Sequence, residues 1–109
     1  MTFIVFENIL SRFFAKMFDT QFQDAVDFVN GHKTLFSKRV SRAETLRFYA
    51  LYKIATCSPK PNIPRPSGWL QSDRIAMWDS WDALDMNKEE AMREYTTRVN
   101  LLKIKFESK

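Results

Sequence analysis

The sequence predicts a small all-α domain, a bundle of helices interrupted by one long loop. The chain has only two glycines, and its four prolines all lie between Pro59 and Pro66, so residues that break helices are concentrated in one segment. Hydrophobic residues make up 45% of the 109 residues and include ten phenylalanines and three tryptophans. That content allows a chain of one-domain length to form a core. Residues outside the loop at about 58–68 are therefore expected to be helical.

Four bundle helices are predicted, and capping patterns mark several of their starts. Thr20 and Ser41 are each followed three residues later by Gln or Glu, the spacing of a capping box, and Asn87 can cap the last helix. A cap at Ser72 or Asp73 would start the third helix. The loop before it is long enough to cross the bundle, so up-down-up-down order is not required. The expected helices are 20–31, 41–57, 72–85 and 87–106.

Apolar residues recur at helical spacing in the last two predicted helices, as expected for faces turned toward a core. In the third helix the stripe consists of Trp78, Trp81 and Leu84, and we expect the tryptophans to be core residues without a role in ligand binding. In the last helix the stripe consists of Ala91, Tyr95, Val99, Leu102 and Phe106.

Residues 1–19 differ in character and are interpreted as an N-terminal amphipathic extension of a domain at 20–109. No apolar run there is long enough to span a bilayer, and the pattern of a signal peptide is missing. The extension is expected to dock on the bundle or self-associate, or to lie on a membrane surface; a targeting segment is a third alternative. Its apolar face would carry Phe3, Phe6, Ile9, Leu10, Phe13, Phe14 and Met17.

Charge is distributed unevenly along the chain. Residues 33–74 carry nine Lys or Arg and two acids, whereas residues 79–94 carry six acids and two bases. A basic middle segment suits an anionic ligand, although an ordinary solvated surface has the same pattern. The acidic segment would repel a nucleic acid, and no nucleic-acid-binding signature occurs, so no nucleic-acid partner is expected. Glu89, Glu90 and Glu94 are expected on a solvated helix face.

The chain offers little for metal or covalent chemistry. Its one cysteine, Cys57, cannot form an internal disulfide, which agrees with a reducing cytosolic compartment. One cysteine and one histidine, His32, cannot build a Cys/His zinc cluster. His32 has no nucleophile at a recognisable spacing and is expected to be a solvated loop residue. We therefore expect no metal, no cofactor and no enzymatic activity.

The segment 47–56 carries a candidate ligand site. It contains no helix breaker, and residues three or four apart share one face of a helix, so Tyr49, Tyr52 and Lys53 point the same way. Two phenol rings beside an ammonium group can stack on a flat heterocycle and hold a phosphate. The same tyrosines could instead be core aromatics with their hydroxyl groups at the surface. Taken alone, the segment indicates a site for a nucleotide-like head group.

Several blocks together resemble the acyl-CoA-binding protein family over about residues 20–106. A Tyr-x-x-Tyr-Lys run is followed, in the family's order and near its spacing, by a Trp-Asp-x-Trp run. The matching blocks are 46–56, Arg65-Pro66, 78–84 and 88–95, with weaker similarity at 22–29. The resemblance implies a four-helix bundle that binds long-chain acyl-CoA thioesters without chemistry, carries them and buffers their free concentration.

The resemblance also implies which residues contact the ligand. Met77 stands where the family usually has a lysine that helps to neutralise the 3'-phosphate of CoA, and Arg74, on the same helical face, is the nearest replacement. Lys33, Lys38 and Arg39 lie near the expected mouth of the site and could compensate for Met77 or contact phospholipid. The implied contacts are Tyr49, Tyr52, Lys53 and Tyr95 at the adenosine-3'-phosphate end, and Leu46 and Val26 along the groove.

The expected function is non-catalytic binding of medium- to long-chain acyl-CoA for intracellular transport and pool buffering, by a monomer in the cytoplasm. Each tail methylene that leaves water contributes about 0.8 kcal/mol, so the tail can supply most of the affinity while the head fixes orientation. The alternative is a membrane-associated interaction module with a degenerate acyl-CoA site. The phenylalanine-rich residues 1–19 and the substitution at Met77 favour this alternative.

Overall fold

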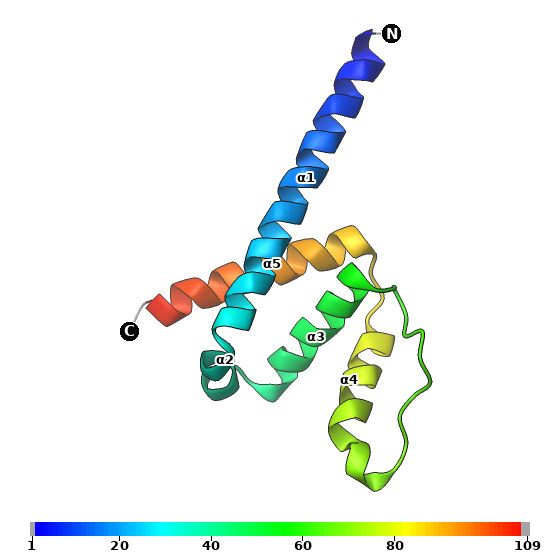
Figure 1. The fold of residues 1–109 in the computed structure, drawn as a ribbon, viewed down its shortest axis with the longest axis vertical. Coiled ribbons are helices and arrows are strands. Elements are labelled where there is room, and N and C mark those ends of the chain that lie inside the picture. The colour runs from blue at the N-terminus through cyan, green and yellow to red at the C-terminus, as the bar shows by residue number, and fades with distance from the viewer. Residues whose placement is uncertain (1, 108–109) are drawn as a thin grey trace.

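The computed structural model of the chain describes residues 2–107, with side chains described from Lys16 onward. This range contains helices and no strand, which confirms the all-α prediction. Figure 1 shows α5 behind α1 and α3, with α4 beside α3. The elements are α1 (Thr2–Gly31), α2 (Lys33–Arg39), α3 (Arg42–Thr56), the 3-10 helix η1 (Trp69–Gln71), α4 (Ser72–Ala83) and α5 (Lys88–Glu107).

The first helix, α1, is continuous over 30 residues. The predicted helix start at Thr20 is therefore wrong: the Thr20 Oγ1 donates within the helix to the carbonyl oxygen of Lys16 at 3.0 Å. The C-terminal part of α1 packs on α5, while its N-terminal part extends away from the other helices (Figure 1). The side chains of the apolar face predicted for residues 3–14 lie outside the described residues.

A short helix, α2, occupies a segment that was predicted only as a connection. His32 lies between α1 and α2. Its ring stacks on Phe28 with ring centroids 4.1 Å apart, and its Nδ1 lies 2.8 Å from the Phe28 carbonyl oxygen. Phe36 of α2 is buried and packs edge-on against Phe48 and Phe106, with centroids 5.6 and 5.9 Å away. This aromatic contact ties α2 to both α3 and α5.

Two of the predicted caps are confirmed. At the start of α3 the Ser41 Oγ accepts a hydrogen bond from the Glu44 N–H at 3.2 Å, and at the start of α5 the Asn87 Oδ1 accepts from the Glu90 N–H at 2.9 Å. The cap predicted for α4 is wrong, because α4 follows η1 directly and no side chain caps its first turn.

The long loop between α3 and α4 is fastened by two tryptophans. Trp78 and Trp81 donate their indole N–H groups to the carbonyl oxygens of Ile63 and Ser58, each at 2.9 Å. The loop returns from the end of α3 to the opposite end of the molecule, so α3 and α4 run in the same direction (Figure 1). This is the crossover connection that the sequence predicted. Trp81 is 1% exposed and belongs to the core, as expected, whereas Trp78 is only half-buried and is not among the core residues, so that part of the prediction is wrong.

A partly buried ion-pair network joins α3 to α5. Arg47 donates to both carboxylate oxygens of Glu94, at 2.6 and 2.8 Å, and Arg98 donates to the same carboxylate at 2.8 Å. Glu44 lies 3.8 Å from Arg98. The expectation that Glu94 is simply solvated is therefore wrong, because its carboxylate links two helices.

No helix in the described part of the chain is both long enough and apolar enough to cross a membrane.

Candidate functional site

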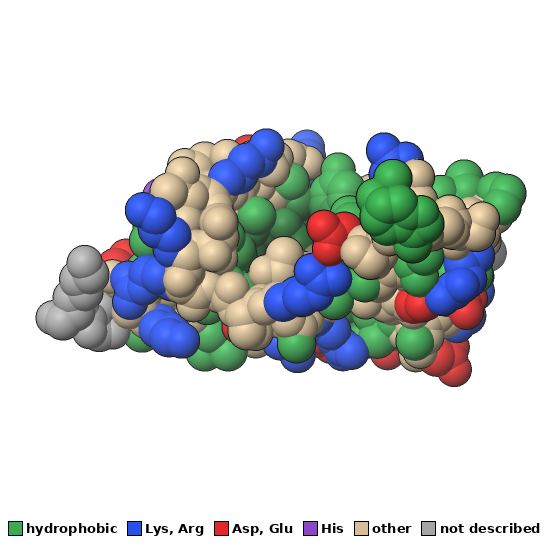
Figure 2. Space-filling model, turned by 90° about the horizontal axis from the view of Figure 1, so that it is seen from below, with side chains coloured by type: hydrophobic (Ala, Val, Ile, Leu, Met, Phe, Trp, Pro, Cys, Tyr) green, Lys and Arg blue, Asp and Glu red, His purple; other side chains and the backbone are tan. Residues whose placement is uncertain are grey.

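A pocket of about 470 Å³ lies between α1, α2 and α3, and Tyr95 of α5 also lines it. Its size falls within the range of about 300–1,000 Å³ that is usual for small-molecule sites. Figure 2, which views the molecule from below, shows a hollow between the α2 side and the α4 side. Hydrophobic side chains lie inside the hollow, and Lys or Arg side chains lie around it. The lining residues are Val26, Val29, Asn30, Lys33, Phe36, Ser37, Thr45, Phe48, Tyr49, Tyr52 and Tyr95.

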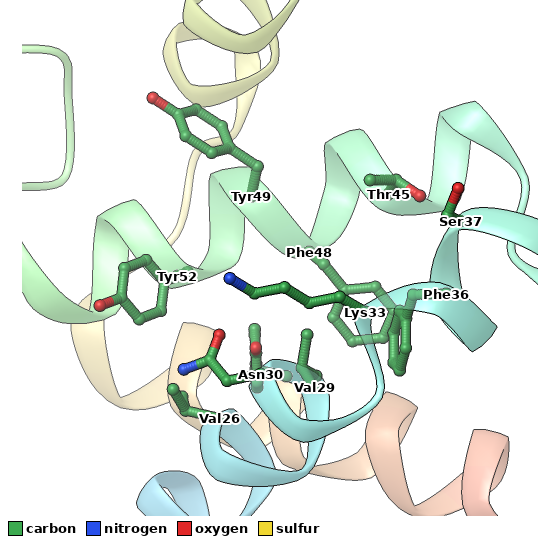
Figure 3. Close-up of a pocket in the computed structure, with 11 residues that line it drawn as sticks. Val26, Val29, Asn30, Lys33, Phe36, Ser37, Thr45, Phe48, Tyr49 and Tyr52 are labelled. Carbon is green, nitrogen blue, oxygen red and sulfur yellow. The ribbon is translucent and has the colours of Figure 1, made fainter.

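Part of the pocket lining is apolar. Val26 and Val29 come from successive turns of α1, and Phe36 and Phe48 face them from α2 and α3. The two phenylalanines lie at the opposite end from Tyr52 in Figure 3. Both rings are less than a tenth exposed and pack edge-to-face, with centroids 5.6 Å apart. A wall of such side chains can bury an alkyl chain.

Three tyrosines form the other part of the lining. Tyr95 is 4% exposed and packs edge-on against Phe22 and Phe48, with both centroid distances 5.2 Å. Burial, with a smaller contribution from Tyr52, raises the pKa of Tyr95 to about 12, so its phenol is neutral at physiological pH. Tyr52 is 38% exposed and Tyr49 is half-buried. The pocket therefore has one fixed ring and two accessible rings.

Lys33 supplies positive charge to the pocket. Figure 3 shows its side chain running from α2 across the pocket toward the side of Tyr52. Among the residues that the structure describes, it is the one Lys or Arg that lines this pocket. The sequence placed Lys33 near the mouth, where it could compensate for Met77, but Lys33 was not among the implied ligand contacts. The sequence held one signal for this contact: a long cationic side chain that follows the end of the helix at Gly31 by two residues.

Lys53 lies beside the tyrosines but outside the pocket lining. Its Nζ is 5.8 Å from the ring centroid of Tyr49 and 5.5 Å from that of Trp81, and it is 4.0 Å from the Sγ of Cys57. These contacts place the ammonium group on the α4 side of α3. Lys53 is half-buried. Because a lysine side chain has a long flexible stem, its ammonium group can adopt other positions.

Two further predicted contacts lie away from this pocket. Leu46 lines a smaller pocket of about 340 Å³ between α3 and α4, together with the small residues Ala50 and Ala83. Arg74 is exposed on the first turn of α4 and is not among the residues that line the larger pocket. Of the seven residues predicted to contact the ligand, the structure thus brings Val26, Tyr49, Tyr52 and Tyr95 together.

The described residues offer no metal site: none of their His, Cys, Asp and Glu side chains gather in groups of three or more that could hold an ion. What the pocket can do follows from its lining. Apolar side chains, accessible phenol rings and one ammonium group can bind an amphiphilic anion without reacting with it.

The fold and the site together define a small helical bundle with a pocket of ligand size. The chain matches the family described as "Acyl CoA binding protein" over residues 19–99, and it belongs to that family. It also resembles the crystal structure of Oryza sativa acyl-CoA-binding protein 2, with a TM-score of 0.69 and 33% sequence identity. That match covers 84% of this chain and 98% of the rice chain, and it confirms the predicted fold.

Curated relatives agree with the family assignment. Acyl-CoA-binding domain-containing protein 4 of Rattus norvegicus is 42% identical over 83 residues, which is 75% of this chain and 25% of the rat protein. Acyl-CoA-binding domain-containing protein 3 of Oryza sativa subsp. japonica is 40% identical over 81 residues, covering 73% of this chain and 50% of the rice protein. The match thus spans a quarter of the length of the rat protein and half of the length of the rice protein.

Proposed function

We propose that this chain binds medium- to long-chain fatty acyl-CoA thioesters non-covalently, carries them within the cell and buffers their free concentration. The observation that carries the proposal is the pocket between α1, α2 and α3, whose lining combines valine and phenylalanine side chains with three tyrosines and Lys33. Acyl-CoA has the matching combination, with an alkyl tail joined to an anionic nucleotide.

The tail is proposed to lie against the apolar wall of Val26, Val29, Phe36 and Phe48. Each methylene transferred there from water contributes about 0.8 kcal/mol. A longer tail therefore binds more tightly until the wall is filled. Because the phenylalanine rings are already packed, the tail meets a surface that needs little rearrangement.

The CoA head is proposed to bind at the tyrosine side. The accessible rings of Tyr49 and Tyr52 can stack on the adenine, and the neutral phenol of Tyr95 can donate to an oxygen of the head group. Lys33, from within the pocket, and Lys53, from the other side of Tyr49, are proposed to hold the phosphates. Lys33 thereby supplies charge that Met77 cannot.

Leu46 and Arg74 remain proposed contacts for parts of the ligand that extend beyond the pocket. Leu46 can receive apolar parts in the small pocket between α3 and α4, where neighbouring alanines leave space. Arg74 is exposed and can reach a phosphate from α4. We propose one ligand per monomer, because one pocket combines both kinds of lining, and carriage in the cytoplasm, which agrees with a free Cys57.

Native mass spectrometry tests this proposal directly. The protein is incubated with an equimolar mixture of acetyl-, octanoyl-, palmitoyl- and free CoA, and its bound species are weighed. We expect a one-to-one complex in which palmitoyl-CoA dominates and free CoA is minor. A folded protein that retains none of these thioesters would contradict the proposal.

A further inference from the structure

A tryptophan and a leucine stand exposed side by side at η1. Trp69 is 87% exposed and Leu70 is 75% exposed, the highest values among the large hydrophobic residues that the structure describes. The other tryptophans differ: Trp78 and Trp81 each donate an indole N–H to a carbonyl group of the long loop. Within the described residues the Trp69 indole has no such acceptor. Neither Trp69 nor Leu70 is therefore used to hold the fold.

The backbone presents these two side chains in a defined position. Gly68, with φ of 103°, turns the chain in a region that favours glycine, and the Gln71 N–H then closes the turn on the Gly68 carbonyl oxygen at 3.1 Å. The turn continues into α4, at the lower end of the molecule in Figure 1. Trp69 and Leu70 thus project from the end of a helix rather than from a free loop.

The charges around η1 favour an anionic partner. Asp73 is paired with Arg42 at 2.9 Å, and Asp79 is paired with Arg65 at 2.8 Å. Both nearby carboxylates are thereby neutralised. Arg74 is exposed and has no ion-pair partner among the described residues. The exposed apolar pair therefore lies close in the sequence to one unpaired cation, Arg74.

A second group of cations lies on the same side of the molecule. Figure 2, seen from below, shows Lys and Arg side chains at the α2 side and hydrophobic side chains at the α4 side of the hollow. Lys33 and Lys38 of α2 are exposed. The mouth of the pocket consequently lies between a basic helix and an apolar tip.

We propose that this side of the protein docks reversibly on an anionic phospholipid bilayer, with Trp69 and Leu70 entering the headgroup region and Arg74 and Lys38 lying near lipid phosphates. An indole ring with a free N–H suits the membrane–water interface, where one edge is apolar and the other is wet. Basic residues near the surface add attraction to anionic lipid. A bilayer fits better than a protein because two apolar side chains fall far short of a stable protein–protein interface.

Docking in this orientation has a consequence for the pocket. Its mouth would face the bilayer surface, where an amphiphilic ligand partitions. Cargo could then pass between membrane and pocket without its tail crossing open water. The docking itself needs no acyl-CoA and does not depend on the proposed function.

Vesicle flotation of the full chain, without acyl-CoA, tests the proposal. Vesicles are made of phosphatidylcholine alone or of phosphatidylcholine with phosphatidylserine. We expect the chain to float with the anionic vesicles and the bound fraction to fall as salt rises. The double variant Trp69→Ser, Leu70→Ser is expected to bind at least fivefold less. Because both side chains are exposed, this variant should keep its helical circular dichroism.

Leu101→Ser is the matched control, since Leu101 is 61% exposed on α5 and its loss removes a similar apolar side chain. The control should float as the parent does. The proposal is overturned if the parent fails to float with anionic vesicles, if the double variant floats as well as the parent, or if the control loses as much binding. Equal flotation with both kinds of vesicle would overturn the role of the cations.

A separate titration keeps this inference apart from the proposed function. Neither Trp69 nor Leu70 lines the pocket, so the double variant should bind palmitoyl-CoA with the affinity of the parent. A parent that floats but binds no acyl-CoA would refute the proposed function and leave the docking surface standing.

Discussion

The ammonium group of Lys53 lies 5.5 Å from the centroid of the Trp81 ring, which is almost completely buried. The same group is 5.8 Å from the ring of Tyr49, a residue of the pocket lining. Tyr49 therefore contacts Lys53 and also lines the pocket. Contacts of this kind with aromatic rings hold a cation weakly, at about 0.5–1 kcal/mol where water has access. A ligand phosphate can therefore draw Lys53 away from Trp81.

Replacing Lys53 with alanine should weaken the binding of palmitoyl-CoA. Loss of a hydrogen bond to a charged group corresponds to roughly a 10- to 100-fold rise in Kd. Isothermal titration calorimetry measures the change, and Lys105→Ala, which removes an equal charge near the end of α5, is the control. An unchanged Kd in Lys53→Ala would remove the role proposed for this residue.

Lys33 and Lys38 of α2 should behave differently from each other. Only Lys33 lines the pocket, so Lys33→Ala should raise the Kd for palmitoyl-CoA by roughly tenfold, whereas Lys38→Ala should leave it within about twofold. The Lys33 effect should also appear with free CoA, because the interaction concerns the head group. If both variants lose affinity equally, the lysines of α2 act through their overall positive charge, and the proposed contact of Lys33 in the pocket is contradicted.

Glu94→Gln should destabilise the protein at neutral pH by about 1–2 kcal/mol, a value reduced from that of a fully buried pair because Arg47 and Glu94 retain some contact with water. Glutamine keeps the shape of the side chain but carries no negative charge, and it offers one acceptor oxygen where the carboxylate offers two to Arg47 and Arg98. Urea unfolding followed by circular dichroism gives the free energy of unfolding. A midpoint equal to that of the parent would contradict the proposed link between α3 and α5.

The same pair predicts how stability depends on pH. The hydrogen bonds from Arg47, helped by Arg98 and opposed by partial burial, hold the pKa of the Glu94 carboxyl below its usual 4.5. Above pH 4.5 the carboxylate is ionised in both the folded and the unfolded chain, so its contribution is fully present. As the pH falls below that value the unfolded chain takes up the proton first, and the contribution is lost by the time the folded carboxyl is protonated. The parent should lose more stability than Glu94→Gln over this acid range.

Trp81→Phe should destabilise the fold more than Trp78→Phe. The first change opens a cavity at a side chain that is 1% exposed and leaves the Ser58 carbonyl group without its donor, a loss of about 2–3 kcal/mol. Trp78 is half-buried, so loss of its bond to Ile63 should amount to about 1 kcal/mol. Urea midpoints compare the two variants. Equal midpoints would mean that the long loop is held by other contacts.

Much of the fold could be predicted because its signals are local. Ser41 and Asn87 cap their helices with the hydrogen bonds that their spacing indicates. The concentration of prolines correctly marked the crossover loop, since proline excludes a helix there. The helix start predicted at Thr20 was wrong because a threonine hydroxyl has two options. It can accept from a following N–H at a helix start, or it can donate to a preceding carbonyl oxygen inside a helix. The structure shows the second arrangement.

The candidate site could be predicted only in part because it depends on tertiary packing. Tyr49 and Leu46 are three residues apart on α3, yet they line pockets that open toward different neighbouring helices. Lys33 enters the pocket because Phe36 packs α2 against Phe48 of α3 and Phe106 of α5. These contacts join residues that are far apart in the sequence. Helical periodicity shows on which face of its helix a residue lies, but it does not show which other helix packs against that face.

Titration calorimetry of the unmodified chain with palmitoyl-CoA, free CoA and palmitate tests the central claim most directly, because the pocket is proposed to need both a tail and a head. We predict saturable one-to-one binding of palmitoyl-CoA and, for each of the two fragments, binding weaker by at least roughly a hundredfold, since either fragment lacks several kcal/mol of contacts. Equal affinity for palmitate or for free CoA, or no heat with palmitoyl-CoA under conditions where the protein is folded, would contradict the account.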